Sequence, residues 1–234
     1  MNGTNLRWVM AAMLCLLVFA ASGCEEWDDI AFLHAKKSIS YPGLISPPEQ
    51  IVFLHQWADE AATCTPAERE HRVALLATDI QKESDPWIRL NILRTLSKYR
   101  TPVSDAIILT ARKDPDLDVR VEACKLLGLR GDAAAVGALR EMLVGDIQVD
   151  VRLASVKALG QTHEPAVVPQ AVAALGTVLE DSNPAIQMGA VESLQRATGK
   201  DFGNDVNRWR QFVRGETPAP AQSPSLAERV RNIF

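Results

Sequence analysis

Basic charge, histidine and aromatic side chains are all scarce in this chain of 234 residues. Its 25 lysine and arginine residues are outnumbered by 29 aspartate and glutamate residues, which leaves a formal net charge of −4. Proteins that bind nucleic acid usually carry a basic stripe or domain, so this balance disfavours that class. Aromatic residues make up only 6% of the chain, whereas alanine, leucine and valine are plentiful, a composition that suits close-packed helices better than a β-sandwich.

The motifs of common enzymes are also missing. The four histidines (His34, His55, His71 and His163) do not form the two-histidine helix motif of zinc peptidases. There is no glycine-rich phosphate loop, no Gly-x-Ser-x-Gly elbow and no Cys-x-x-Cys pair. We therefore expect no catalytic residue, no metal and no cofactor, and we expect that the protein is not an enzyme.

The first 24 residues read as an export signal. Arg7 precedes an apolar run at residues 8–20, which is too short to span a membrane but suits the middle of a signal peptide. The run leads into Ala21-Ser22-Gly23-Cys24, which resembles the bacterial lipoprotein cleavage box, although leucine is commoner where Ala21 stands. The resemblance implies that Cys24 becomes the acylated N-terminus and holds the protein on a bilayer. An uncleaved anchor and an ordinary secretory signal are the alternatives.

A tether is expected at residues 25–48, because its prolines and glycine break longer structure. Glu25 stands where an aspartate marks inner-membrane retention in some Gram-negative bacteria, so the resemblance favours the outer membrane. The expected location is the bacterial cell envelope, facing the periplasm or the exterior.

One pattern is then written four times between residues 83 and 194. An arginine or glutamine sets the register, at steps of 31, 32 and 35 residues: Arg89, Arg120, Arg152 and Gln187. Six places earlier stands an acid: Glu83, Asp114, Asp146 and Asp181. Seven places later stands a leucine: Leu96, Leu127, Leu159 and Leu194. A repeat of this period predicts a solenoid.

Each repeat reads as two helices joined by a tight turn. The first helices are expected at 66–82, 102–113, 133–144 and 165–180, and the second helices at 85–99, 116–129, 149–159 and 184–198. Every second helix carries an apolar stripe that one helix pair cannot bury, so the units must stack. Gly128 and Gly160 are expected to end their helices. Cys124 falls in the apolar stripe and is expected in the core; a disulfide with Cys64 is a less favoured alternative.

Capping elements are expected at both ends of the stack, which occupies residues 49–214. A helix at 49–62 carries Trp57 to cover the first unit, and Phe202, Trp209 and Phe212 cover the last. An aromatic binding patch is the alternative for these last three. Residues 215–234 read as a Pro/Ala/Ser linker with a short amphipathic segment, which docks on the solenoid, docks on a partner or stays disordered.

The repeat closely resembles HEAT repeats, particularly the short bacterial HEAT-like form, over residues 65–198. The resemblance implies an all-α, right-handed α-solenoid of about four helix pairs. It also implies a structural ladder in which the acids and arginines of the repeat hydrogen-bond between successive turns. Gln187 departs from the pattern, so the ladder should be weaker there.

A protein-binding function follows from these expectations. Solenoids offer extended binding surfaces, and Arg94, Lys125 and Lys157 form a basic column on the second helices that switches to Glu192. We expect this column to contact an acidic segment of another envelope protein, against the alternative that the charges are only solvated. A bilin-lyase-like activity, or another HEAT-like enzyme or chaperone activity, is the rival function. DNA-binding HEAT-like repair proteins and HEAT-type iron hydroxylases fit less well, since the latter need several His-Glu pairs and only His163-Glu164 is present.

Overall fold

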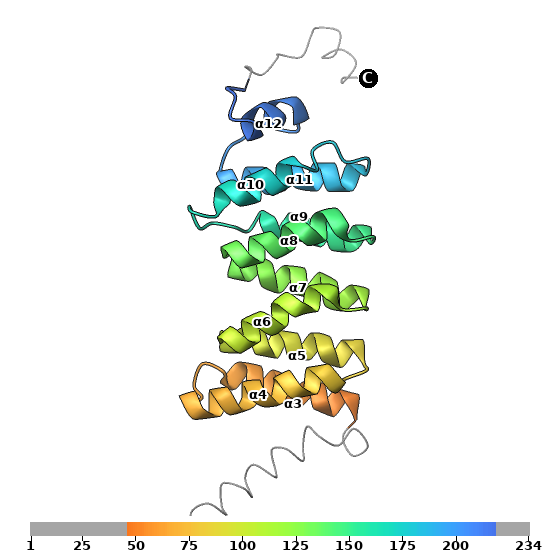
Figure 1. Cartoon of the computed structure of the whole chain (residues 1–234), viewed down its shortest axis with the longest axis vertical. Coiled ribbons are helices and arrows are strands. Elements are labelled where there is room, and N and C mark those ends of the chain that lie inside the picture. Colours follow the sequence, from red (N-terminus) through yellow and green to blue (C-terminus); the bar gives the residue numbers. More distant parts are fainter. Residues whose placement is uncertain (1–45, 219–234) are drawn as a thin grey trace, which may run out of the picture.

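The computed structural model describes residues 46–218, and all of its regular elements within that range are helices (Figure 1). They are α3 (Pro47–Glu60), α4 (Pro66–Lys82), α5 (Pro86–Tyr99), α6 (Pro102–Thr110) with the 3₁₀ turn η1 (Ala111–Lys113), α7 (Leu117–Arg130), α8 (Ala133–Gly145), α9 (Val149–Leu159), α10 (Val168–Gly176), α11 (Pro184–Thr198) and α12 (Val206–Val213). The predicted signal peptide with Cys24, the predicted tether up to residue 45 and the segment 219–234 lie outside the described residues.

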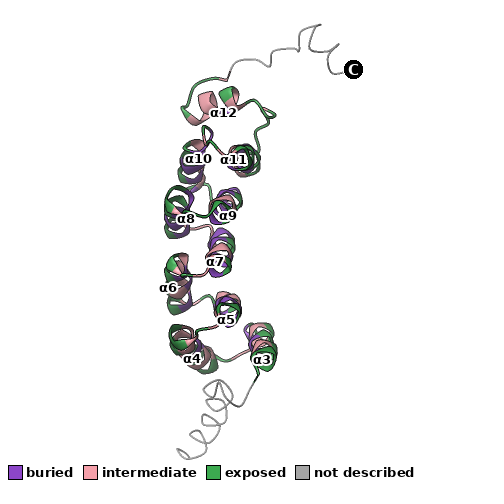
Figure 2. Ribbon diagram, turned by 90° about the vertical axis from the view of Figure 1, so that its right-hand side faces the viewer, coloured by how far each residue is buried: buried purple, intermediate pink, exposed green. Residues whose placement is uncertain are grey.

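The helices stack in two layers (Figure 2). Layer A contains α3, α5, α7, α9 and α11, and layer B contains α4, α6, α8 and α10. Within layer A each helix packs on the next, and α12 packs on α10 and α11 at the C-terminal end. The predicted all-α solenoid is therefore confirmed.

Local sequence signals set most helix boundaries. The side chains of Thr65, Thr101 and Asp132 each accept a hydrogen bond from a backbone N–H in the first turn of α4, α6 and α8. Such caps satisfy donors that a helix start would otherwise leave unpaired. Proline at the first position of α4, α5, α6 and α11 pre-sets the helical φ without losing a helical hydrogen bond.

The helix expected at 165–180 is the clearest departure, because the structure forms only α10 over Val168–Gly176. The carbonyl of Glu164 accepts from the N–H groups of both Val167 and Val168 at 2.9 Å, which tightens the chain into a turn before the helix. After Gly176 the chain continues in short turns, as in the bond from Val178 N–H to the carbonyl of Leu175 at 3.2 Å. Proline and glycine at the two ends thus leave about half of the expected helix as turns.

The expected role at a helix end is wrong for Gly128, which lies inside α7. It holds for Gly160, which is the C-cap of α9, although its φ of −67° is an ordinary right-handed value. Both are points of close helix contact, because an added Cβ would lie 2.9 Å from Ala158 Cβ and 2.7 Å from Ser193 Cβ, respectively. The left-handed residues that end α7 and α11 are Gly131 and Gly199, with φ of 64° and 66°. These two close approaches hold α7 to α9 and α9 to α11.

The core runs between the layers and contains the residues expected there. Cys124 is fully buried, and burial raises the pKa of its thiol to about 11. Its Sγ lies 3.2 Å from Ser155 Oγ, while Cys64 is a separate free thiol, so the two cysteines do not form a disulfide. Trp57 and Trp209 are both buried, at opposite ends of the stack.

Candidate interaction surface

The repeated acids lie at the turns between the layers and the arginines lie in the first turn of the layer A helices, where together they form a ladder. Arg89 donates from Nη2 and Nε to the two carboxylate oxygens of Asp114, at 2.7 and 2.9 Å. Arg120 does the same to Asp146, at 3.2 and 2.8 Å, and Arg152 binds Asp181. Each arginine therefore binds the acid of the following repeat, not the acid six places before it.

Each arginine is also tied to its own unit through backbone carbonyls. Arg120 Nη1 donates to the carbonyl of Asp114 at 2.9 Å, and Arg89 Nη1 donates to that of Ser84 at 2.9 Å. The hydrogen bonds that Arg89 donates to Asp114 raise the pKa of the Arg89 guanidinium, against the effect of burial. Bidentate pairs of this kind combine strength with fixed geometry, so the ladder holds successive repeats in register.

The two ends of the ladder differ from its middle. At the C-terminal end, Gln187 has no charge and donates from Nε2 to the carbonyl of Leu179 at 2.8 Å. At the N-terminal end, no arginine in the described range binds the Glu83 carboxylate, whose Oε1 accepts the N–H of Asp85 at 2.8 Å. The charged rungs are thus the three that join the four repeats.

The three side chains of the basic column on layer A differ in their contacts, although the sequence predicted one exposed column. Arg94 forms a bidentate pair with Glu122 at 2.8 and 3.0 Å, and Lys125 Nζ lies 3.1 Å from the same carboxylate. Burial favours the neutral form of Glu122, but the hydrogen bonds from Arg94 and Lys125 outweigh burial and hold its pKa below its usual value. Two of the three basic side chains therefore serve first to neutralise a buried acid.

Glu122 is a site residue that sequence reasoning missed. It stands two places after the register arginine, where the other repeats carry Asn91, Ala154 and Gly189. Its side chain is only 7% exposed, whereas that of Arg94 is 41% exposed. A single glutamate in a column of small or neutral residues is the signal that could have revealed it.

Lys157 is different, because it is exposed and forms no ion pair within residues 46–218. It borders a hollow of about 350 Å³ on layer A between α7 and α9. The other lining side chains are Val121, Lys125, Asp150, Leu153, Ala154, Ala158 and Gln161. The hollow therefore has an apolar floor with two lysines and one aspartate at its edge.

Aromatic side chains close the C-terminal end as a packed cluster. The Trp209 ring lies 4.8 Å from that of Phe202 and 5.9 Å from that of Phe212, centroid to centroid. Trp209 Nε1 donates to the carbonyl of Gly203 at 2.9 Å, and the side chain is fully buried. This burial favours the cap over the binding patch.

Residues 46–218 contain no group of three or more His, Cys, Asp or Glu side chains placed to hold a metal ion. No helix in the same part of the chain has the length and apolarity of a membrane span.

The comparisons with known proteins agree with the fold. The family model of HEAT repeats matches residues 104–170, from α6 to the start of α10. Among curated proteins, none matches the chain. The central part of the chain is therefore similar to HEAT repeats, and it lies within the helical solenoid described above.

Proposed function

We propose that the chain is a lipid-anchored adaptor of the bacterial cell envelope, which holds another protein on layer A of its solenoid and is not an enzyme. The observation that carries the proposal is the hollow between α7 and α9, which joins two neighbouring repeats on an exposed face. An apolar floor gives a partner side chain something to bury, and Lys125 and Lys157 attract carboxylates around it. The matching partner is an acidic segment with an apolar anchor.

The lipid anchor rests on the cleavage-box resemblance that ends at Cys24. The anchor would be tested by growing cells with a labelled fatty acid and comparing the natural chain with Cys24→Ala. Acylation of Cys24 predicts that the label enters the natural chain alone and that the variant leaves the membrane fraction. Equal labelling of the two chains would contradict the anchor.

The adaptor function would be tested in the native envelope by placing a photo-crosslinking amino acid at Leu153, in the hollow. The control position is Arg140, which is exposed on α8 in layer B. One dominant envelope protein captured at position 153 and absent at 140 would support the proposal. Equal or no capture at both positions would contradict it.

Two variants of the protein extend the same crosslinking experiment. Lys157→Glu should weaken capture without unfolding the protein, because Lys157 has no ion-pair partner among residues 46–218. A chain that lacks residues 215–234 should still capture the partner if the repeats bind it. Loss of capture from this shortened chain alone would instead make the C-terminal segment the docking element.

A further inference from the structure

Helix α3 continues layer A although it lies outside the fourfold sequence pattern. It packs directly on α5, as α5 packs on α7. Aligning the first residues of the two helices, Pro47 and Pro86, places Leu54 and Trp57 at the positions of Leu93 and Leu96, and all four are buried. The same alignment places Gln50 at the position of Arg89.

This register identifies an incomplete rung at the N-terminal end of the ladder. In the next three rungs, an arginine on a layer A helix binds the acid that follows the next layer B helix. Gln50 stands in the place of that arginine, and Glu83 stands in the place of the acid. Glu83 has no ion-pair partner among the residues that the structure describes.

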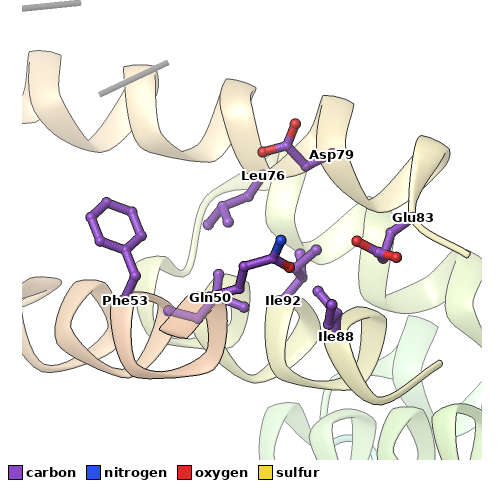
Figure 3. A pocket seen from close by; sticks show the side chains of 8 residues that line it. Gln50, Phe53, Leu76, Asp79, Glu83, Ile88 and Ile92 are labelled. Atoms are coloured by element: carbon purple, nitrogen blue, oxygen red, sulfur yellow. The ribbon is translucent and has the colours of Figure 1, made fainter. Parts of the chain in front are cut away.

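A small pocket lies between Gln50 and Glu83 (Figure 3), with a volume of about 30 Å³. Its walls are Phe53 and Leu54 from α3, Leu76 and Asp79 from α4, and Ile88 and Ile92 from α5. Figure 3 shows the amide of Gln50 and the carboxylate of Glu83 on either side of a space next to Ile88 and Ile92, with Asp79 above them on α4 and its carboxylate directed upward. The pocket therefore combines apolar walls with two acids.

Asp79 gives this rung a second acid that the other repeats lack. The equivalent positions, four places before each ladder acid, hold Thr110, Met142 and Thr177. Asp79 Oδ2 is buried and has no hydrogen-bond partner within residues 46–218. Burial raises the pKa of Asp79 to about 6, with Lys82 opposing the rise and Glu83 adding to it, so the group is mostly ionised at neutral pH.

We propose that this pocket binds the guanidinium group of an arginine from another polypeptide, which completes the first rung of the ladder. The three occupied rungs show that the same backbone arrangement binds guanidinium groups. A planar fork of donors matches two carboxylates, while Phe53 and Ile92 contact the aliphatic stem.

Other cations fit the walls less well. Calcium needs six to eight oxygen ligands, and the pocket offers two carboxylates among mostly apolar side chains. The site is also separate from the α7–α9 hollow, so it does not depend on the adaptor function proposed above. It adds a second contact point, specific for arginine, at the N-terminal end.

The proposal would be tested on the full chain in detergent micelles by NMR of its leucine and isoleucine methyl groups. The probe is N-acetyl-arginine methylamide, which mimics an arginine within a polypeptide, and the matched neutral control is N-acetyl-citrulline methylamide. We expect saturable shifts at Leu76, Ile88 and Ile92 with the arginine probe alone. Equal shifts with citrulline, or no shifts with either probe, would overturn the proposal.

Substitutions locate the site. Asp79→Asn and Glu83→Gln should each weaken binding of the arginine probe by roughly tenfold, since each removes a charged hydrogen-bond acceptor. Glu192→Gln, which removes an exposed acid on α11 far from the pocket, should leave the affinity unchanged. Unchanged affinity in both pocket variants would contradict the assignment.

An arginine placed at position 50 of the chain itself tests the same site. Gln50→Arg should place a guanidinium between Asp79 and Glu83, block the probe and raise the thermal midpoint by about 2–4 °C. Gln50→Met, of similar length but without charge, should still bind the probe. If the probe shifts the methyl groups of Gln50→Arg as it shifts those of the natural chain, the proposal is wrong.

Discussion

Among the residues that the structure describes, Glu122 is the one charged residue that is buried. Its negative charge is neutralised in the folded state by the guanidinium of Arg94. Removing one partner of a buried pair leaves the other charge without compensation. We expect Arg94→Ala to lower the free energy of unfolding by about 1–2 kcal/mol, at the lower end for such pairs because Arg94 is 41% exposed. Denaturant titration measures the change.

Lys157→Ala is the control for this prediction, since Lys157 is exposed and is expected to change stability by less than about 0.5 kcal/mol. Equal effects of the two substitutions would show that the Arg94–Glu122 pair adds nothing to the free energy of unfolding.

The same pair explains why charge reversal at Arg94 or Lys125 is a poor test of partner binding. Either change would place a second acid beside Glu122 and disturb the fold itself.

Asp79 should give the protein an unusual pH dependence. Its folded pKa is about 6, against an ordinary value of 3.8, so between these values the folded state binds more protons than the unfolded state. This group therefore adds stability as the pH falls from about 6 toward 4 and loses that contribution as the pH rises. Lowered pKa values at Glu122 and Asp132 act in the opposite direction, so only a comparison isolates the effect.

The comparison is with Asp79→Asn, which keeps the shape of the side chain and removes its titration. The difference in unfolding free energy between the variant and the natural chain should grow by roughly 1 kcal/mol from pH 5 to pH 7 in favour of the variant, after discounting for the half-buried site. A difference that does not change with pH would contradict the raised pKa.

At the scale of helices, the close approach of α7 to α9 should make Gly128 sensitive to the smallest addition. A Cβ there would lie 2.9 Å from Ala158 Cβ and 3.0 Å from its Cα, so α9 would have to move. We expect Gly128→Ala to cost about 1–3 kcal/mol of unfolding free energy. Thermal or denaturant unfolding would measure it.

Gly137→Ala is the matched control, because Gly137 is exposed within α8 and an added Cβ meets nothing within 4 Å. It should stabilise the protein by up to about 1 kcal/mol, since alanine favours helix more than glycine does. A stabilising effect of Gly128→Ala would show that α7 and α9 are not held by this contact.

Helices that follow local signals could be predicted from the sequence. The bounds of α4, α9 and α11 agree with the predicted ranges, because a cap, a proline or a periodic stripe marks each one. The short α10 could not be predicted, since its length depends on turns at both ends. The glycine contacts could not be predicted either, because a spacing near a helix end does not reveal how closely the next helix packs.

At the scale of the whole molecule, repetition made the fold predictable and hid the sites. Four copies of one pattern imply stacking, whatever each residue contacts. The sites arise where a copy departs from the pattern: Glu122 in the second unit, Asp79 in the first, and Gln50 on a helix that the pattern does not reach. Their partners lie on neighbouring helices, so only the assembled stack shows them.

Because each repeat contacts only its neighbours, damage to one end of a solenoid should stay local. Trp209 is fully buried against Phe202 and Phe212 and covers α10 and α11. Trp209→Ala should cost about 3–5 kcal/mol and speed backbone hydrogen exchange in α10, α11 and α12. Protection in α4 and α5, at the other end of the stack, should stay unchanged (Figure 1).

Trp87→Ala is the control, because it removes a tryptophan that is 54% exposed and should alter hydrogen exchange little anywhere. If Trp209→Ala instead speeds exchange equally in α4 and in α11, the ladder and the core couple all the repeats into one cooperative unit, and the partner-binding units would unfold together with the cap.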